Sequence, residues 1–176
     1  MAGTLAQLRV TPDAPPRFAG SREQGSFSEN QFPVAQSADD GLSPIDVAGW
    51  ALMLQGAVYL PQQWSYQQLV LRSATEITAT MDGTLGWFST QVWRGVRLKD
   101  LLATVGTQRE ATAIGLKAAT GYAQTLTPAE AREVLRATHV RNERLEHWHG
   151  FPLRAVVPSR RTWFWVKWLT EIEVLA

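Results

Sequence analysis

The sequence contains no cysteine. This absence excludes disulfide bonds, zinc–thiolate sites, iron–sulfur clusters and thiol nucleophiles. It leaves the redox compartment open, because a chain without cysteine is compatible with an oxidising or a reducing environment.

Long apolar runs and an excess of one charge are also lacking. No apolar stretch approaches the ~20 residues that a membrane-spanning helix needs, and Met1 to Thr4 have neither the basic region nor the apolar segment of a secretory signal. The formal net charge is only +1, and the basic residues are spread along the chain. We therefore expect no membrane span in this chain and no nucleic-acid binding.

Tryptophan, in contrast, is abundant, with eight among 176 residues. Rings of this size usually build a core, although some can face a ligand. The length suffices for one substantial core, and we expect a flexible segment over residues 1–17 followed by a single domain over residues 18–176. Residues 11–46 have no apolar period and indicate an extended arm, which Phe18, Phe27 and Phe32 are expected to pin to the body.

The rest of the chain alternates between strand and helix patterns. Strands are predicted over residues 50–58, 76–81, 113–117, 153–157 and 163–174. Two helices are predicted to begin at capping boxes, and a third follows from the spacing of four apolar residues before a glycine cap: Ser65 with Gln68, Thr127 with Glu130, and Leu98, Leu101, Leu102 and Val105 before Gly106. This mixture predicts an α+β fold with mixed or antiparallel sheets and peripheral helices.

Three blocks of sequence occur in a characteristic order. The first is Gly-Ser-Phe-Ser-Glu-Asn-Gln-Phe-Pro over residues 25–33, and the second covers residues 79–96 and ends in Trp-Arg-Gly-Val. The third begins as His-Gly-Phe-Pro-Leu-Arg at residues 149–154 and continues to Val-Lys-Trp at residues 166–168, and Thr-Gly-Tyr at residues 120–122 precedes it. Together they resemble the molybdopterin-binding domain family of oxidoreductases that includes sulfite oxidase. The resemblance spans residues 18–174 and implies the α+β fold of the sulfite oxidase cofactor domain.

The resemblance also implies a molybdopterin cofactor and the residues around it. A pterin cofactor ends in a phosphate and presents a flat heterocycle, so its site needs cations, forked donors and glycines. The implied cations are Arg154, Arg160, Arg161 and Lys167. The implied lining residues are Asn30, Gln31, Phe32, Gly83, Thr84, Thr120 and His149, with Tyr122 nearer the substrate.

Two departures from the family pattern bear on activity. Asp82-Gly83-Thr84 stands where the family has Asp-Cys-Thr, whose cysteine is the sole protein ligand to molybdenum, and glycine offers no soft donor in its place. Ser159 and Thr162 replace two glycines where the backbone approaches the ligand. Two interpretations stay open: a sulfite oxidase-like molybdopterin-binding domain with impaired activity, or a non-catalytic binding or structural module that keeps the fold without molybdenum.

Several of these residues also have simpler interpretations. His147 and His149 would share one strand face, but no third ligand is evident, so we predict no protein metal site and a hydrogen-bonding role for His149. Arg160 and Arg161 could form a solvated turn. No catalytic residue is assigned. The resemblance further implies an extracytoplasmic location, in a longer membrane-anchored protein, and a membrane-bound electron carrier as partner.

Overall fold

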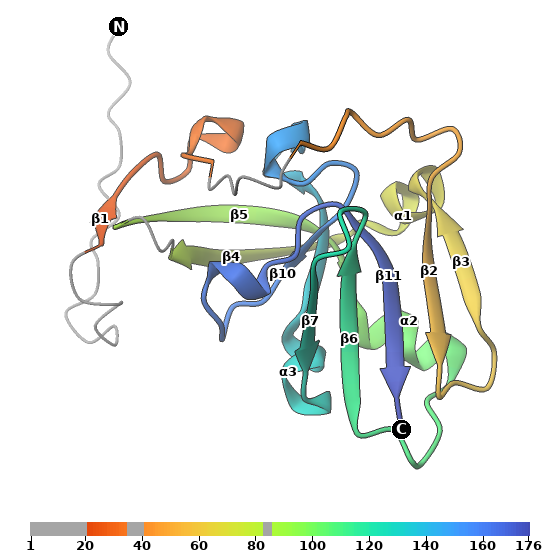
Figure 1. Cartoon of the computed structure of the whole chain (residues 1–176). Helices are drawn as coiled ribbons and strands as arrows, with labels where there is room; N and C mark the ends of the chain where they lie inside the picture. The colour runs from red at the N-terminus through yellow and green to blue at the C-terminus, as the bar shows by residue number, and fades with distance from the viewer. Residues whose placement is uncertain (1–20, 35–40, 83–85) are drawn as a thin grey trace, which may run out of the picture.

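The computed structural model describes residues 21–34, 41–82 and 86–176, which form two β-sheets with helices at their edges (Figure 1). The first sheet contains β1 (Arg22–Glu23), β4 (Thr75–Asp82), β5 (Trp87–Arg97), β8 (Leu135–Val140), β9 (Glu143–Arg144) and β10 (Arg154–Val156). The second contains β2 (Ala51–Gly56), β3 (Gln62–Ser65), β6 (Ala113–Ala118), β7 (Ala123–Leu126) and β11 (Leu169–Leu175).

Short helices connect these strands. The α-helices are α1 (Tyr66–Arg72), α2 (Leu98–Val105) and α3 (Pro128–Glu133), and the 3₁₀ helices are η1 (Glu29–Gln31), η2 (His147–His149) and η3 (Thr162–Phe164). All three α-helices begin where the sequence predicted them, and the two predicted capping boxes are present at Ser65 and Thr127. In the part of the chain that the structure describes, no helix has the length and apolar character needed to cross a bilayer.

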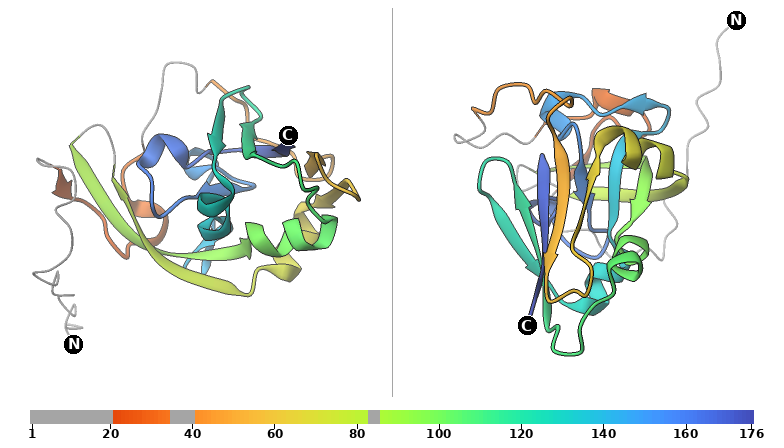
Figure 2. Two further views of the ribbon diagram at one scale, coloured as in Figure 1. Left: turned by 90° about the horizontal axis from the view of Figure 1, so that it is seen from below. Right: turned by 90° about the vertical axis from the view of Figure 1, so that its right-hand side faces the viewer.

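The sheets are mixed. In the first, the order is β1-β5-β8-β10, with β4 paired to β5 and β9 to β8, and β1 lies parallel to β5. In the second, the order is β3-β2-β11-β6-β7, with β11 parallel to β2 and antiparallel to β6. Strands β4 and β5 run crosswise to the second sheet and extend beyond it toward β1 (Figures 1 and 2). The predicted α+β fold class is confirmed.

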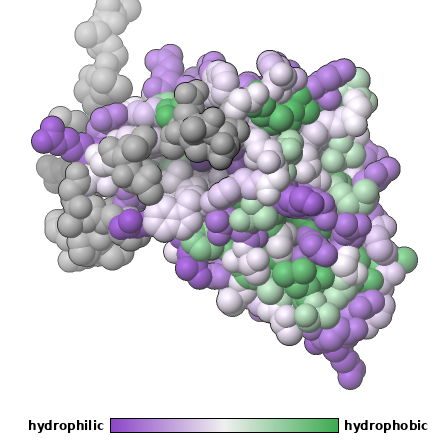
Figure 3. All heavy atoms as spheres, viewed as in Figure 1, coloured by the Kyte–Doolittle hydropathy of each residue, from purple (hydrophilic) through white to green (hydrophobic). Residues whose placement is uncertain are grey.

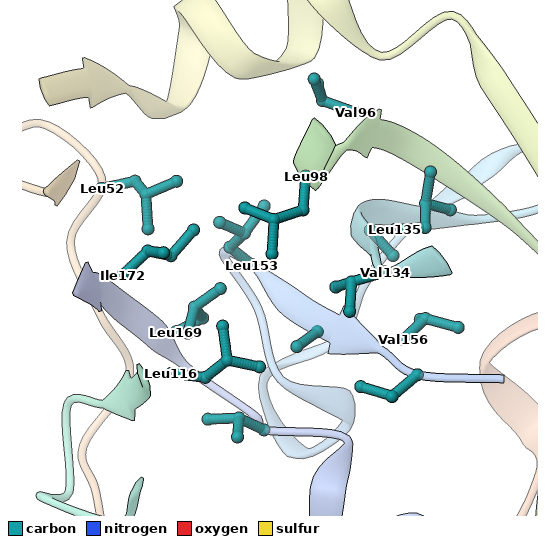
Figure 4. Close-up of a cluster of buried hydrophobic side chains, with 14 of the residues drawn as sticks. Leu52, Val96, Leu98, Leu116, Val134, Leu135, Leu153, Val156, Leu169 and Ile172 are labelled. Atoms are coloured by element: carbon teal, nitrogen blue, oxygen red, sulfur yellow. The ribbon is translucent and has the colours of Figure 1, made fainter. Parts of the chain in front are cut away.

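The core lies between the two sheets. Leu52, Leu116 and Ile172 from the second sheet face Leu135 and Val156 from the first, and all five are fully buried (Figure 4). Hydrophobic residues from both sheets form one continuous cluster. The outer surface carries hydrophilic side chains interspersed with hydrophobic ones (Figure 3), as the small net charge suggests.

Two local predictions are wrong. The last strand begins at Leu169 and not at residue 163, because η3 occupies the start of the predicted range and Trp168 has a φ of 51°. Left-handed backbone cannot continue an extended strand, so the alternation of the tryptophans in this segment is not a strand pattern. His147 and His149 lie on a 3₁₀ helix and not on a strand face.

Some predictions fall outside the described residues. These are the flexible segment over residues 1–17 and the anchoring role of Phe18. Phe32 in the arm is 2% exposed, as an anchoring residue would be, while Phe27 is only half-buried.

Candidate cofactor site

Three separate segments of the chain meet at the end of strand β4. Ser21 from the arm donates to Asp82 Oδ1 over 2.8 Å, and the Thr162 hydroxyl donates to the Asp82 carbonyl. Among the described residues, no partner reaches the other carboxylate oxygen of Asp82, Oδ2, although it is buried. Gly83 and Thr84 lie outside the described residues, so the contacts of Asp82 define only where their loop begins.

The arm reaches this place by pairing with the edge of β5. The Arg22 N–H donates to the Gly86 carbonyl over 2.9 Å, just after the loop that follows β4. Further along, Gln91 Nε2 donates to the Gly25 carbonyl over 2.6 Å. These contacts bring η1 and Phe32 toward the residues that follow β9.

His149 is the centre of the contact between the arm and the C-terminal third. Its Nε2 lies 2.8 Å from the Asn30 carbonyl, and its ring centroid is 3.9 Å from that of Phe32. Burial lowers the pKa of His149 to about 4, and the cations Arg154 and Lys167 lower it further, against the opposing effect of the Asn30 hydrogen bond. The ring is therefore neutral near pH 7, and because a carbonyl can only accept, Nε2 carries its proton.

Arg154 is a buried cation at the same place. Its side chain is covered to 4% exposure, Nη1 donates to the His149 carbonyl over 2.9 Å, and Nη2 lies 3.0 Å from the thioether sulfur of Met81. Within the described residues, its Nε has no partner and no carboxylate pairs with it. Burial lowers the pKa of Arg154 to about 9, so the group stays charged at neutral pH. Since Met81 directly precedes Asp82, this charge sits at the end of β4.

The side chain of Asn30 is engaged with β9 and the residues after it. Its amide nitrogen donates to Glu143 Oε2 over 3.1 Å and to the Arg144 carbonyl over 2.9 Å, while Oδ1 accepts from the Glu146 N–H over 3.1 Å. The neighbouring Gln31 is exposed. Asn30 therefore fixes the arm against the body, and its carbonyl orients His149.

A polar rim lies between the β6–β7 turn and η3. The Tyr122 hydroxyl donates to the Trp163 carbonyl and accepts from Gln124 Nε2, each over 2.7 Å. The Thr120 hydroxyl accepts from the Tyr122 N–H over 3.4 Å. The structure thus brings Thr120 and Tyr122 to the segment that carries Arg160 and Arg161.

The other implied cations occupy different surroundings. Arg160 forms an ion pair with Glu130 of α3, and the guanidinium of Arg161 lies 5.5 Å from the centroid of the Trp163 ring. Lys167 Nζ is 4.2 Å from the centroid of the Trp168 ring. A Cβ at Gly150 would lie 3.1 Å from the Lys167 Cα and 3.2 Å from the Arg154 Cβ, so these two cationic residues are neighbours at the backbone. Arg154 and Lys167 are together, whereas Arg160 is held at the rim.

Sequence reasoning missed the residues that support Arg154. The ring of Trp93 lies 5.7 Å from the Arg154 guanidinium, and Trp165 packs edge-on against Trp93 with 5.7 Å between ring centroids. The Trp165 N–H donates to the Arg160 carbonyl over 2.9 Å. The alternating burial along β5 could have placed Trp93 inward, but its partner Met81 has no sequence signal.

The donor set fits the two parts of a molybdopterin cofactor differently. The buried charge of Arg154 and the adjacent Lys167 suit a phosphate or the acceptor atoms of a pterin. The metal is not accommodated in the family's way, because the chain has no cysteine and the described residues contain no group of three His, Asp or Glu side chains that could hold an ion. The site therefore fits the organic part of the cofactor and lacks the thiolate for the metal.

Comparison with known proteins agrees with this assignment. Residues 40–176 match the family described as the oxidoreductase molybdopterin binding domain. YuiH of Bacillus subtilis (strain 168), an uncharacterized oxidoreductase, is 30% identical over 161 residues, which cover 87% of this chain and 81% of that protein. The NAD(P)H nitrate reductase of Hordeum vulgare is 28% identical over 163 residues, 73% of this chain but 18% of that protein.

The fold is also found in a solved structure. The crystal structure of the sulfane dehydrogenase SoxCD from Paracoccus pantotrophus matches with a TM-score of 0.71 at 17% identity, over 99% of this chain and 56% of that chain. This chain thus spans about half of the SoxCD chain and a smaller part of the nitrate reductase. On these grounds, the chain belongs to the oxidoreductase molybdopterin-binding domain family.

Proposed function

We propose that this chain binds the pterin and phosphate of molybdopterin at the end of β4 and holds no molybdenum through a protein sulfur. The observation that carries the proposal is Arg154, a buried cation without a carboxylate partner among the described residues. A buried charge is costly unless it is paired, and an anionic or acceptor-rich ligand would pair it.

The neighbouring residues have distinct parts in this proposal. His149 offers a neutral ring fixed by the arm, Lys167 adds a second charge beside Arg154, and Tyr122 stands at the rim. When bound, the cofactor supplies the redox chemistry, while the protein supplies binding and orientation. Without the thiolate at position 83, oxygen-atom transfer of the sulfite oxidase type is expected to be impaired.

The substitution Gly83→Cys tests the metal part of the proposal. The full chain is purified from a host that synthesises the cofactor, pterin is measured by fluorescence after oxidation, and molybdenum is measured by mass spectrometry. Loss of even an outer-shell partner costs about 10–100-fold in metal affinity, so the new thiolate is expected to raise molybdenum per pterin by at least about tenfold. Thr84→Cys, with the thiol one residue away, is the control and should change little. Stoichiometric molybdenum in the unmodified protein would contradict the proposal.

The substitution Arg154→Met tests the pterin part. Replacing an unpaired buried cation by an apolar chain of similar length is expected to stabilise the cofactor-free protein by about 1 kcal/mol, while pterin retention falls by about tenfold or more. Thermal unfolding and pterin fluorescence measure the two effects. A purely structural Arg154 would give lower stability with unchanged pterin.

Arg136→Met is the matched control for this experiment. Arg136 is also fully buried, and its pKa is likewise lowered to about 9 by burial, but its Nη2 donates to the backbone carbonyls of Val96 and Arg97. It is expected to affect stability and to leave the pterin content of the folded protein unchanged.

The second candidate is a module that keeps the fold without any cofactor. It is favoured by the fact that Asn30, His149 and Tyr122 already have hydrogen-bond partners within the protein. It predicts that neither the unmodified chain nor Gly83→Cys retains pterin. A membrane-bound electron carrier is required only under the first candidate, and only if the bound cofactor turns over.

A further inference from the structure

A row of basic side chains crosses the first sheet away from the candidate cofactor site. Arg94 on β5 pairs with His139 on β8, and His139 pairs with Arg144 on β9. On the other side, Arg94 pairs with Glu76 on β4. Residues paired across antiparallel strands project from the same face, so these four side chains form one line, which we call the basic row.

The basic row lies on the opposite face from the residues around Arg154. Trp93 and Val140, the pair directly beside Arg94 and His139, are fully buried, and the Trp93 ring contacts Arg154. Successive side chains of a strand point to opposite faces. Arg94 and His139 therefore project away from the candidate cofactor site.

The charges in the row are not compensated by the protein. Within the described residues, Arg94 and Arg144 form no ion pair, and the buried Arg94 Nε has no hydrogen-bond partner. Glu76, the one carboxylate in the row, is exposed and lies within ion-pair distance of no cation. Like charges directly opposite each other in a sheet are destabilising, so the row is expected to gain stability from an anion.

The hydrogen bonds of His139 fix which of its nitrogens can meet an anion. Ser73 donates its hydroxyl proton to the Leu69 carbonyl over 2.8 Å, so in its 2.9 Å contact with Thr138 the threonine must donate. Thr138 then has no proton left for His139, and His139 Nδ1 must donate to the threonine oxygen over 2.8 Å. Protonation of the ring consequently places a new donor at Nε2.

Aromatic side chains flank one end of the row. The guanidinium of Arg144 lies 4.7 Å from the centroid of the Phe151 ring, and Phe151 packs edge-on against Tyr66 with 5.2 Å between centroids. Arg144 and Phe151 also line a cavity of about 440 Å³, together with His147 and Trp148. A ligand at the row would thus have an apolar and aromatic space beside it.

We propose that the basic row binds a phosphate group, held by the guanidinium groups of Arg94 and Arg144 and by the imidazole of His139. Two guanidinium forks and one imidazolium match a tetrahedral dianion in both charge and donor number. The phosphate comes either from free inorganic phosphate or from a phosphate monoester whose remaining part occupies the adjoining cavity.

Calorimetric titration of the full chain tests this at constant ionic strength, with inorganic phosphate and phenyl phosphate as probes. Each of Arg94→Gln and Arg144→Gln is expected to weaken phosphate binding by about tenfold, the value of one hydrogen bond to a charged group. Arg109→Gln, which removes the same charge from an exposed turn before β6, should leave it unchanged. Tighter binding of phenyl phosphate indicates a monoester ligand, and equal binding indicates free phosphate; both support the site.

The ring of His139 gives a second, local readout. Burial and the charges of Arg94 and Arg144 lower its pKa in the free protein, and the other titratable groups around it are Tyr66 on α1, Glu143 on β9 and, beyond Arg94, Glu76 on β4. Phosphate is expected to raise this pKa, measured by NMR titration of the ring with and without the anion. The proposal is overturned if phosphate acts no differently from chloride, if it leaves His139 unchanged, or if the binding persists in both Arg94→Gln and Arg144→Gln.

Discussion

Replacing Gly95 by alanine is expected to destabilise the fold by about 3 kcal/mol and to lower the melting temperature by about 10 °C. A Cβ at this position would lie 1.9 Å from the Arg136 carbonyl oxygen and 2.8 Å from the Ala137 Cα. Both are backbone atoms of β8, so no side chain can move aside. The register between β5 and β8 shifts next to Gly95, which brings the two strands unusually close. Thermal or urea unfolding measures the effect.

Gly115→Ala is the matched control, because Gly115 also lies within a strand of a sheet. Its added Cβ would meet only Glu173, at 3.6 Å from the carbonyl oxygen, which is an ordinary contact. This variant is expected to be neutral or slightly stabilising, since alanine loses less conformational freedom on folding than glycine. Equal losses in the two variants would show that the close approach at Gly95 does not govern stability.

Acidification is expected to destabilise the protein by about 3 kcal/mol through His149. The pKa of this residue is about 4 in the folded protein and 6.5 when unperturbed, chiefly because the ring is buried. The unfolded chain therefore binds the proton more readily. The stabilisation is complete above pH 6.5, and it is lost progressively as the pH falls toward 4, where the folded form is also protonated.

Unfolding free energies measured between pH 4 and pH 7 test this expectation. His149→Gln keeps a hydrogen-bond donor for the Asn30 carbonyl but does not titrate, so its stability should vary less with pH than that of the unmodified protein. His139, whose pKa is also lowered by burial, contributes a change of the same sign. His139→Gln is therefore the comparison that separates the two residues, and an unchanged pH dependence in His149→Gln would contradict the assignment.

Most of the fold follows from local sequence patterns. The capping boxes at Ser65 and Thr127 mark the starts of α1 and α3 because their hydrogen bonds involve only neighbouring residues. The β-branched run before Asp82 forms β4 in full. Such signals need no knowledge of the tertiary structure, and they were sufficient for the α+β class.

The segment from Trp163 to Trp168 shows where local patterns fail. Its alternation of large rings resembles a strand, but the chain turns through η3 because Trp165 and Trp168 each donate their indole N–H to a distant carbonyl. The donors bond to Arg160 and His147, and these contacts depend on the packing of the whole domain. Periodicity alone cannot distinguish such a turn from a strand.

The residues of the candidate site were identified by resemblance, and their contacts could not be read from the sequence. Nothing in the spacing of Asn30 indicates that its amide bonds to β9, or that its carbonyl orients His149. The engagement of Arg160 by Glu130 depends on α3 lying beside the turn after β10. Whether these residues contact a cofactor remains the subject of the experiments proposed above.

The contact between Asn30 and His149 joins residues that are 119 positions apart. During synthesis the arm leaves the ribosome well before the residues that it must meet, and closing so long a loop carries an entropic cost before the contact is gained. The arm is therefore expected to dock late, after both sheets have formed. Any ligand that needs the arm and His149 together can be enclosed only in that final step, so loading would depend on the timing of chain completion.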